Sequence, residues 1–307
     1  MNDYVALLIG IACAGAGGEL FVRGTVGTAG ALRISPGIIA TTIAAFATSS
    51  PELTVAINSA LHGTPRIALG DALGSNVVNV ALILAAALLI APITATRDMV
   101  RRDLPVALTI PVILAALLFD GVLSQADGLL LLGLFAGWLV AVIREARRQR
   151  SAAGAVLGEQ KPLRAAIEGV AGLGLLIVAG RLIVTGATNI AEAQGIDPFI
   201  VGATVVAIGT SVPELATVII SGIRGHKEVG LGTILGSNIF NGLFIIGVAA
   251  SIAPITITLR EVAPALTLGL AAVALTYPPL TGTIGRWRGI TLLGVYFTYL
   301  FAVLQWR

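Results

Sequence analysis

Two glutamates, Glu52 and Glu214, lie in the middle of long apolar stretches of the sequence. Each directly follows a proline and stands four residues after a threonine, so both belong to the pattern Thr-Ser-x-Pro-Glu, at residues 48–52 and 210–214. A carboxylate at bilayer depth is costly and usually serves ion binding or transport. Proline lacks the backbone donor that a helix needs. The pattern therefore predicts a helix that is broken beside each carboxylate, with backbone carbonyl oxygens exposed at the break.

A second polar pattern, Gly-Ser-Asn-x-x-Asn, occurs twice and ends at Asn79 and at Asn241. Its serine and its last asparagine are four residues apart, so Ser75 shares one helix face with Asn79, and Ser237 shares one with Asn241. Together with the two glutamates and the threonines before them, these side chains offer oxygen ligands and two formal negative charges. Such a set suits Ca²⁺ or Na⁺ better than zinc or copper.

The two copies of each pattern are separated by the same interval of 162 residues. When residues 34–79 are aligned with 196–241 without a gap, 20 of 46 positions are identical. Polar residues are kept along with apolar ones, which indicates an internal duplication rather than chance similarity between apolar segments. The middle asparagines of the second pattern, Asn76 and Asn238, are expected to form hydrogen bonds between helices.

The composition places this duplication in a membrane. The chain is 56% hydrophobic and 11% charged, against about 25% charged in soluble domains. Apolar runs of about 20 residues recur along most of its length. We therefore expect an all-α membrane protein with ten transmembrane helices, at roughly 4–24, 36–61, 66–91, 101–119, 127–146, 164–187, 198–223, 227–251, 262–280 and 287–305.

Five spans in each copy would insert the second copy upside down, giving two inverted five-helix repeats. The expected division is a first α-repeat half at 1–146, a cytoplasmic linker at 147–163 and a second half at 164–307. With the N-terminus outside, most of the 19 Lys and Arg residues fall on the cytoplasmic side, as the positive-inside rule requires. This predicts a multi-pass protein of the cell inner (plasma) membrane with both termini outside. Nucleic-acid binding has no support, because the basic residues lie at helix ends.

The paired patterns, in two copies over nearly the whole chain, resemble the calcium/cation antiporter superfamily, and within it the prokaryotic sodium/calcium exchanger branch. The resemblance implies ion sites formed by helices 2, 3, 7 and 8, all broken. The expected partners are Ca²⁺ and Na⁺ (or H⁺), bound as substrates, and membrane lipid. We expect the protein to function as a monomer without a cofactor. The ion ligands that it implies are Thr48, Glu52, Thr210, Glu214, Ser49, Ser75, Asn79, Ser211, Ser237 and Asn241, with the carbonyls of Ala45 and Ala207.

Two positions depart from the family pattern. Ala47 stands where the family has glycine before the threonine, although Gly209 keeps it in the second copy. Asn241 stands where sodium/calcium exchangers commonly have aspartate, so the site has two fixed carboxylates rather than three. Asparagine keeps an oxygen ligand and resembles a protonated aspartate. Calcium binding can survive this change, but the coupling ion and the stoichiometry are left open.

The function expected from these features is a secondary active antiporter that exports Ca²⁺ in exchange for Na⁺ by alternating access. The alternative is an H⁺/Ca²⁺ exchanger in which the same two glutamates carry protons. A passive cation channel is a remote alternative, because a self-contained inverted repeat suits alternating access. An intramembrane protease has less support, since Asp71 has no second aspartate at the membrane centre.

The first and sixth expected spans are rich in small residues, which allow helices to approach closely. These are Ala14 to Gly18 in the first span and Gly169, Gly172, Gly174 and Gly180 in the sixth. Tight static packing and sliding of the two helices are both compatible with this pattern. Glu19 and Arg181 occupy matching positions in these two spans. They are interpreted as packing or cavity-lining charges.

Overall fold

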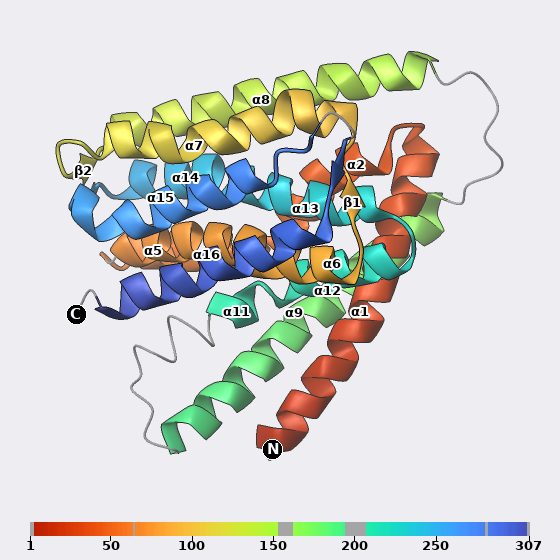
Figure 1. Ribbon diagram of the computed structural model, residues 1–307, viewed down its shortest axis with the longest axis horizontal. Coiled ribbons are helices and arrows are strands. Elements are labelled where there is room, and N and C mark those ends of the chain that lie inside the picture. The colour runs from red at the N-terminus through yellow and green to blue at the C-terminus, as the bar shows by residue number, and fades with distance from the viewer. Residues whose placement is uncertain (1–2, 64, 153–161, 194–206, 280–281, 306–307) are drawn as a thin grey trace. The chain divides into compact units, whose positions relative to one another are not determined.

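The computed structural model describes residues 3–63, 65–152, 162–193, 207–279 and 282–305, and it is helical apart from two short β-ribbons (Figure 1). Six helical segments of the described chain are long and apolar enough to cross a membrane: Asp3–Leu32, Pro65–Ile90, Gln125–Gln149, Pro162–Leu182, Lys227–Ile252 and Arg286–Gln305. The bent pair Pro36–Thr48 and Ser50–Leu61 adds a seventh when it is taken as one broken span. The protein is therefore an all-helical membrane protein.

The other expected spans are represented by shorter helices. The fourth contains the π-helix η3 (Met99–Asp103) and α7 (Leu104–Leu117), and the ninth contains α15 (Leu259–Leu275). The seventh span is expected at 198–223, and its residues 198–206 lie outside the described residues. The rest of this span contains α11 (Ala207–Thr210) and α12 (Val212–Ile223). Residues 153–161 of the expected linker also lie outside the described residues.

The chain divides into two compact units. The first contains Met1–Thr48 and Ala146–Thr233, and the second contains Ser49–Glu145 and Ile234–Arg307. Each unit thus combines segments from both halves of the sequence.

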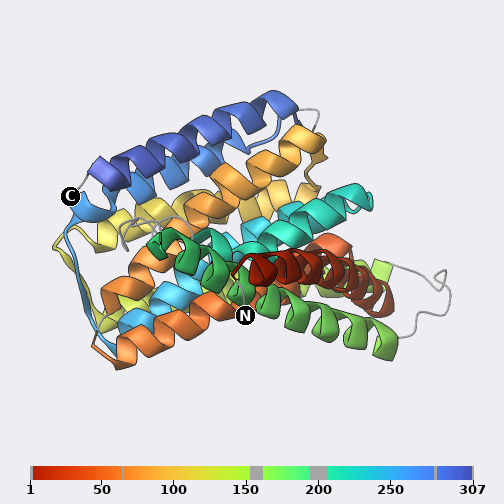
Figure 2. The ribbon, with the colours of Figure 1, turned by 90° about the horizontal axis from the view of Figure 1, so that it is seen from below.

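In the first unit, α1 (Asp3–Leu32) and α9 (Pro162–Ala193) lie side by side (Figure 1, Figure 2). Their contact is between backbones. A Cβ atom added at Gly24 would lie 2.3 Å from the Gly169 nitrogen, and one at Gly172 would lie 2.4 Å from the Phe21 nitrogen. The small residues therefore make a tight seam between the two helices, whereas a Cβ at Gly174, on another face, would meet nothing within 4 Å.

Both Thr-Ser-x-Pro-Glu patterns contain the same local change of direction. In the first copy, α2 (Pro36–Ile39), η1 (Ala40–Ala44) and α3 (Ala45–Thr48) are followed by Ser49 with φ −86° and ψ 12°, and α4 (Ser50–Leu61) begins after it. In the second copy, Ser211 has φ −87° and ψ 10° between α11 and α12. The proline occupies the first turn of the new helix, where its missing N–H costs nothing.

The third and eighth expected spans contain π-helical turns rather than interruptions. α5 (Pro65–Val77) continues into η2 (Val78–Leu84) and α6 (Ala85–Ile90). The second copy repeats this order with α13 (Lys227–Ile239), η5 (Phe240–Ile245) and α14 (Ile246–Ile252). Such turns widen a helix locally and are frequent at functional sites. Each π-helix begins one residue before the last asparagine of the second pattern, a feature that sequence reasoning did not predict.

Two β-ribbons join the sequence copies in the second unit. β1 (Ile93–Thr94) pairs antiparallel with β4 (Thr283–Ile284), and β2 (Val122–Leu123) pairs antiparallel with β3 (Ile255–Thr256). Each ribbon thus contains one strand from each half of the sequence. The last helices of the two halves, α8 (Gln125–Ala152) and α16 (Arg286–Gln305), begin directly after β2 and β4.

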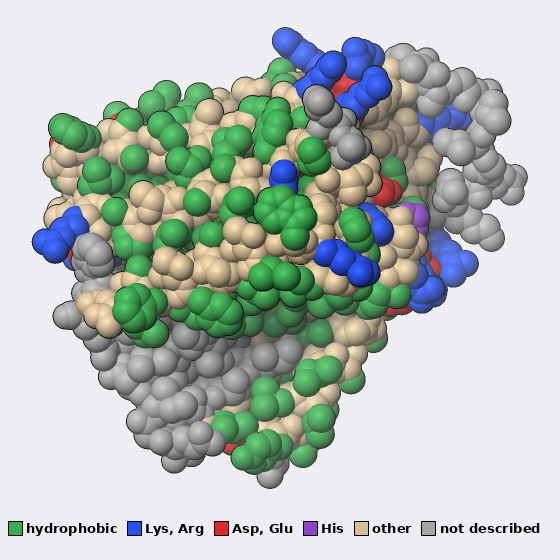
Figure 3. Space-filling model, viewed as in Figure 1, with side chains coloured by type: hydrophobic (Ala, Val, Ile, Leu, Met, Phe, Trp, Pro, Cys, Tyr) green, Lys and Arg blue, Asp and Glu red, His purple; other side chains and the backbone are tan. Residues whose placement is uncertain are grey.

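Much of the exposed surface of the helices in both units is apolar. Large hydrophobic side chains are exposed on several helices, including Leu8, Leu163, Val170 and Phe297. In the space-filling view, hydrophobic side chains are spread over the visible face, and many of the Lys and Arg side chains gather on its right-hand part (Figure 3). An exposed apolar surface of this kind is expected where lipid, rather than water, contacts the protein.

Candidate cation site

Glu52 and Glu214 are buried, with 1% and 0% of their surface exposed. Each is the third residue of a helix, α4 or α12, that starts directly after the serine break. Backbone N–H groups at a helix start carry partial positive charge, which favours an acidic side chain there. A helix that ends at the break also leaves its last carbonyl oxygens outside its own hydrogen-bond ladder. One short segment therefore offers a buried carboxylate and backbone carbonyls, the oxygen types that Ca²⁺ and Na⁺ prefer.

Three of the predicted hydroxyl ligands belong to the first unit with Glu214. Thr48 ends α3, which packs on α12, and Thr210 and Ser211 directly precede α12. Thr48 and Ser211 are fully buried, and Thr210 is half-buried. The Thr48 hydroxyl donates to the Ala45 carbonyl oxygen at 3.3 Å. The Ser211 hydroxyl oxygen has no hydrogen-bond partner among the described residues, so it is available to a ligand.

The remaining predicted side chains belong to the second unit with Glu52. In this unit α4, α5 and η5 contact one another, which brings together the elements that carry Glu52, Ser75 and Asn241. Ser49, Ser75, Ser237, Asn79 and Asn241 are all buried. Across the described residues, no three His, Cys, Asp or Glu side chains come together. A cation bound in this unit would therefore depend on hydroxyl and amide oxygens in addition to one carboxylate.

The middle asparagines bond the two copies to each other. The Asn76 Nδ2 donates to the Asn238 carbonyl oxygen, and the Asn238 Nδ2 donates to the Asn76 carbonyl oxygen, both at 3.2 Å. The interpretation of Asn76 and Asn238 as residues that bond helix to helix is therefore confirmed. Because a backbone carbonyl can only accept, these two bonds fix which end of each amide is the nitrogen.

This fixed geometry determines the orientation of a third amide. With its Nδ2 committed to Asn76, Asn238 presents its Oδ1, and the Asn79 Nδ2 donates to that atom at 3.3 Å. The other end of the Asn79 side chain must then be Oδ1, which is buried and has no hydrogen-bond partner among the described residues. Asn238 thus orients the Asn79 oxygen, a role that sequence reasoning missed, although the spacing Asn-x-x-Asn in both copies was a signal for it.

Several other buried polar atoms of the second unit lack a hydrogen-bond partner among the described residues. They include the Ser75 Oγ, the Asn76 Oδ1 and both amide atoms of Asn241. Most buried polar groups in folded proteins are satisfied, so a cluster of exceptions needs an explanation. The Asn79 and Asn241 oxygens and the Ser75 hydroxyl are neutral oxygen donors of the type that completes a cation site around a carboxylate.

Glu19 and Arg181, the charges at matching positions in the first and sixth spans, have different surroundings. Glu19 pairs with Arg23 and Arg224 and lines a cavity, as interpreted from the sequence, whereas Arg181 is exposed.

Long apolar helices that carry buried acidic, hydroxyl and amide side chains define a membrane transporter for ions. The family described as sodium/calcium exchanger protein matches residues 3–144 and 167–305. The chain therefore belongs to the sodium/calcium exchanger family. Members of this family are transporters, so the protein is not an enzyme, and the ions it exchanges are substrates and not cofactors.

Individual relatives match over nearly the full length. The chain is 35% identical to the inner membrane protein YrbG of Escherichia coli, over 89% of this chain and 87% of YrbG. It is 34% identical to the putative antiporter CaxA of Alkalimonas amylolytica, over 98% of both chains. Among solved structures, the sodium-calcium exchanger NCX_Mj soaked with Na⁺ and Sr²⁺ matches with a TM-score of 0.84 and 26% identity, over 96% of both chains.

Proposed function

We propose that this protein is a secondary active antiporter that exports Ca²⁺ in exchange for Na⁺ by alternating access. The observation that carries the proposal is the pair of buried glutamates, Glu52 and Glu214, each on the first turn of a helix that follows the same serine break. Buried carboxylates are stable when a cation compensates them. The likeness to NCX_Mj, described as a sodium-calcium exchanger, supports Na⁺ and Ca²⁺ as the ions.

The proposed ligands are the residues that the repeated patterns and the family resemblance predict. They are Glu52, Glu214, Thr48, Thr210, Asn79, Asn241, Ser75, Ser237, Ser49 and Ser211, with the carbonyls of Ala45 and Ala207. Two ionised carboxylates give a charge of −2, which one Ca²⁺ or two Na⁺ would neutralise. Ca²⁺ and Na⁺ would then compete for the same carboxylates, and this competition would couple their movements. Without a bound cation, the site would contain two uncompensated carboxylates. The protein would then rarely switch between its outward-facing and inward-facing conformations, because buried uncompensated charge is costly.

We further propose the ten-span arrangement of two inverted five-helix repeats, in the plasma membrane, with halves at 1–146 and 164–307, a cytoplasmic linker at 147–163, both termini outside and a functional monomer. The shared serine breaks, the shared π-helices and the two ribbons support this duplication. Single cysteines in a Cys13→Ser background test the topology. Ser151→Cys should react with a membrane-impermeant thiol reagent from the cytoplasmic side, and Asp120→Cys from the outside. Reaction of both from one side would refute the inverted arrangement.

The decisive test of the function is uptake of radiolabelled calcium into proteoliposomes under an imposed Na⁺ gradient or, separately, a pH gradient. Uptake driven by Na⁺ alone supports the proposal. Uptake that persists without a gradient of either ion would instead indicate a passive channel.

An H⁺/Ca²⁺ exchanger is the second candidate. Asn241 favours this function. It stands where sodium/calcium exchangers commonly have aspartate, so only Glu52 and Glu214 remain as fixed carboxylates, and each could carry one proton in exchange for Ca²⁺. Uptake driven by the pH gradient alone, and lost when both glutamates are replaced by glutamine, would assign this function.

A further inference from the structure

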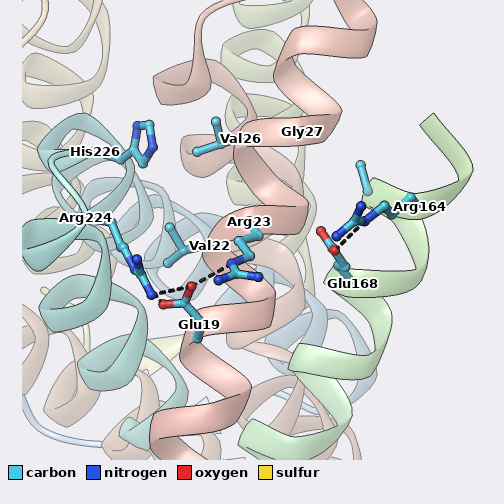
Figure 4. A pocket seen from close by; sticks show the side chains of 10 residues that line it. Glu19, Val22, Arg23, Val26, Gly27, Arg164, Glu168, Arg224 and His226 are labelled. Carbon is cyan, nitrogen blue, oxygen red and sulfur yellow. Dashed lines mark hydrogen bonds and ion pairs between the residues drawn. The ribbon is translucent and has the colours of Figure 1, made fainter. Parts of the chain in front are cut away.

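A cavity of about 550 Å³ lies in the first unit, and no residue of the repeated patterns lines it (Figure 4). Its walls come from α1, α9 and the turn between α12 and α13. The charged or ionisable side chains that line it are Glu19, Arg23, Arg164, Glu168, Arg224 and His226. This volume falls in the range that holds a small molecule or a headgroup rather than a bare ion.

The two glutamates hold the three arginines in place. Glu19 accepts from the Arg23 Nε at 2.6 Å and from the Arg224 Nε and Nη2, both at 2.8 Å, as the dashed lines in Figure 4 mark. On the opposite wall, the Arg164 Nε donates to Glu168 at 2.9 Å. Among the described residues, Arg23 and Arg164 use only Nε in these pairs, so both of their Nη groups remain available as donors.

The carboxylates lie beneath the guanidinium groups. The Glu19 and Glu168 side chains are only 23% and 19% exposed, whereas Arg23 and Arg224 are each 53% exposed and Arg164 is 71% exposed. A ligand that enters the cavity would therefore meet arginine before it meets glutamate. Three arginines against two glutamates also leave the lining with a net positive charge.

Apolar side chains line the cavity in addition to the charged ones. Val22 and Val26, on successive turns of α1, also line it, on the side of Arg224 and His226 (Figure 4). The distribution of positive charge in the sequence assigns all three arginines to the cytoplasmic side of the membrane. Arginines together with valines at the end of membrane helices match a ligand that has an anionic head and an apolar body.

We propose that this cavity binds the phosphate of an anionic phospholipid headgroup. Guanidinium groups recognise phosphate through paired N–H donors, and basic pockets between membrane helices bind such headgroups. The bound phosphate would connect α1, α9 and the α12–α13 turn, three segments far apart in the sequence, and would stabilise their packing. The site is independent of the proposed ion exchange, so either assignment can fail without the other.

Lipid retention tests the proposal directly. The purified full-length protein would be placed in nanodiscs of phosphatidylcholine with or without phosphatidylglycerol, and the lipids that remain bound would be measured by native mass spectrometry, together with the thermal midpoint. Wild type should retain phosphatidylglycerol in preference to phosphatidylcholine. Each arginine near an anionic headgroup changes affinity by roughly fivefold. The double variant Arg23→Gln/Arg164→Gln should therefore lose retention by about tenfold or more.

The matched control is Arg97→Gln/Arg101→Gln, which removes two basic residues of the same expected membrane side that do not line the cavity. It should retain the lipid as wild type does, and Arg23→Lys/Arg164→Lys, which keeps the charge, should retain part of it. Equal loss in the control and in the cavity variant, or no preference of wild type for phosphatidylglycerol, would overturn the proposal. Equal stabilisation by inorganic phosphate in phosphatidylcholine nanodiscs would overturn the lipid assignment in favour of a soluble anion. If the glutamine variant does not fold, retention by wild type and by the lysine variant still decides the question.

Discussion

The two copies of Gly-Ser-Asn-x-x-Asn have the same backbone but different side-chain hydrogen bonds. In both copies the last asparagine is buried in a π-helix. In the first copy its Nδ2 is held by the Asn238 Oδ1. The equivalent bond in the second copy would run from the Asn241 Nδ2 to the Asn76 Oδ1. It is not formed: both amide atoms of Asn241 and the Asn76 Oδ1 lack a hydrogen-bond partner among the described residues. Duplication thus gives the same chemical groups twice, but the packing between the copies orients only Asn79.

This difference has an energetic consequence. A buried donor or acceptor without a partner costs about 1–3 kcal/mol. Asn79 leaves one such atom and Asn241 leaves two. A bound cation could satisfy the oxygen of each, but it would repel an amide nitrogen. We therefore infer that Asn79 is an oxygen donor with a preset orientation, whereas Asn241 must orient itself when an ion binds. This inference and the proposed ion site lead to four predictions.

The largest effect is expected where the two copies are alike, at the glutamates. Glu52→Gln and Glu214→Gln should each reduce calcium transport by roughly two orders of magnitude or more, because each removes half of the fixed charge and charge count tunes calcium affinity over several decades. Transport into proteoliposomes measures this, and membrane insertion is checked in parallel. The control is Glu261→Gln, at the exposed start of α15, where hydrogen bonds from the Thr258 backbone and hydroxyl lower the pKa of Glu261. Near wild-type transport in either site variant would show that the site is misplaced.

Restoring an acid at position 241 should change the charge moved per cycle. Asn241→Asp adds a third titratable group, so the variant should carry more Na⁺ per Ca²⁺ and should become more dependent on pH. A reversal-potential assay with fixed ion gradients measures the stoichiometry. The matched variant Asn79→Asp places a carboxylate against the Asn238 Oδ1 and should lower the thermal midpoint more than Asn241→Asp does. If wild type and Asn241→Asp have equal reversal potentials at acidic and alkaline pH, residue 241 does not determine the charge moved per transport cycle.

The middle asparagines should also differ in importance. Asn238→Leu removes its own bond to Asn76 and the acceptor that orients Asn79, whereas Asn76→Leu removes only its own bond to Asn238. Loss of a residue that orients a metal ligand typically costs about 10–100-fold in affinity. We expect roughly a tenfold rise in the KM for calcium with Asn238→Leu and a smaller rise with Asn76→Leu. If the two variants behave alike, the asymmetry between the copies has no functional role.

The smallest effect is expected at Ser75, whose hydroxyl is buried without a hydrogen-bond partner among the described residues. Ser75→Ala should leave the thermal midpoint of the ion-free protein unchanged or slightly raised, because no hydrogen bond is lost. The shift of the midpoint on adding calcium should decrease, because ligand stabilisation follows affinity. A lower midpoint without calcium and an unchanged calcium shift would make Ser75 a structural residue.

The sequence by itself determined the features that depend on local chemistry. Apolar runs specify membrane helices because lipid must contact them. The Ser-x-Pro-Glu pattern specifies where a helix restarts because proline at the first turn loses no helical hydrogen bond. The two glutamates and the serine and asparagine ligands could be proposed from composition and spacing, and the resemblance named the family. Hydrogen bonding between helices was also predicted for Asn76 and Asn238, although not that the two residues would bond to each other.

Only the tertiary structure decided which amide is oriented and which is not. A hydrogen bond is made or lost over a few tenths of an ångström, and that distance depends on how helices from different halves of the chain pack. The same reason applies to the cavity between α1 and α9, where Glu19 meets Arg224 across 205 residues of sequence. Identical motifs therefore have different hydrogen bonds. Asn79 lies within hydrogen-bond distance of its partner in the other copy, Asn238, whereas Asn241 forms no such bond with Asn76.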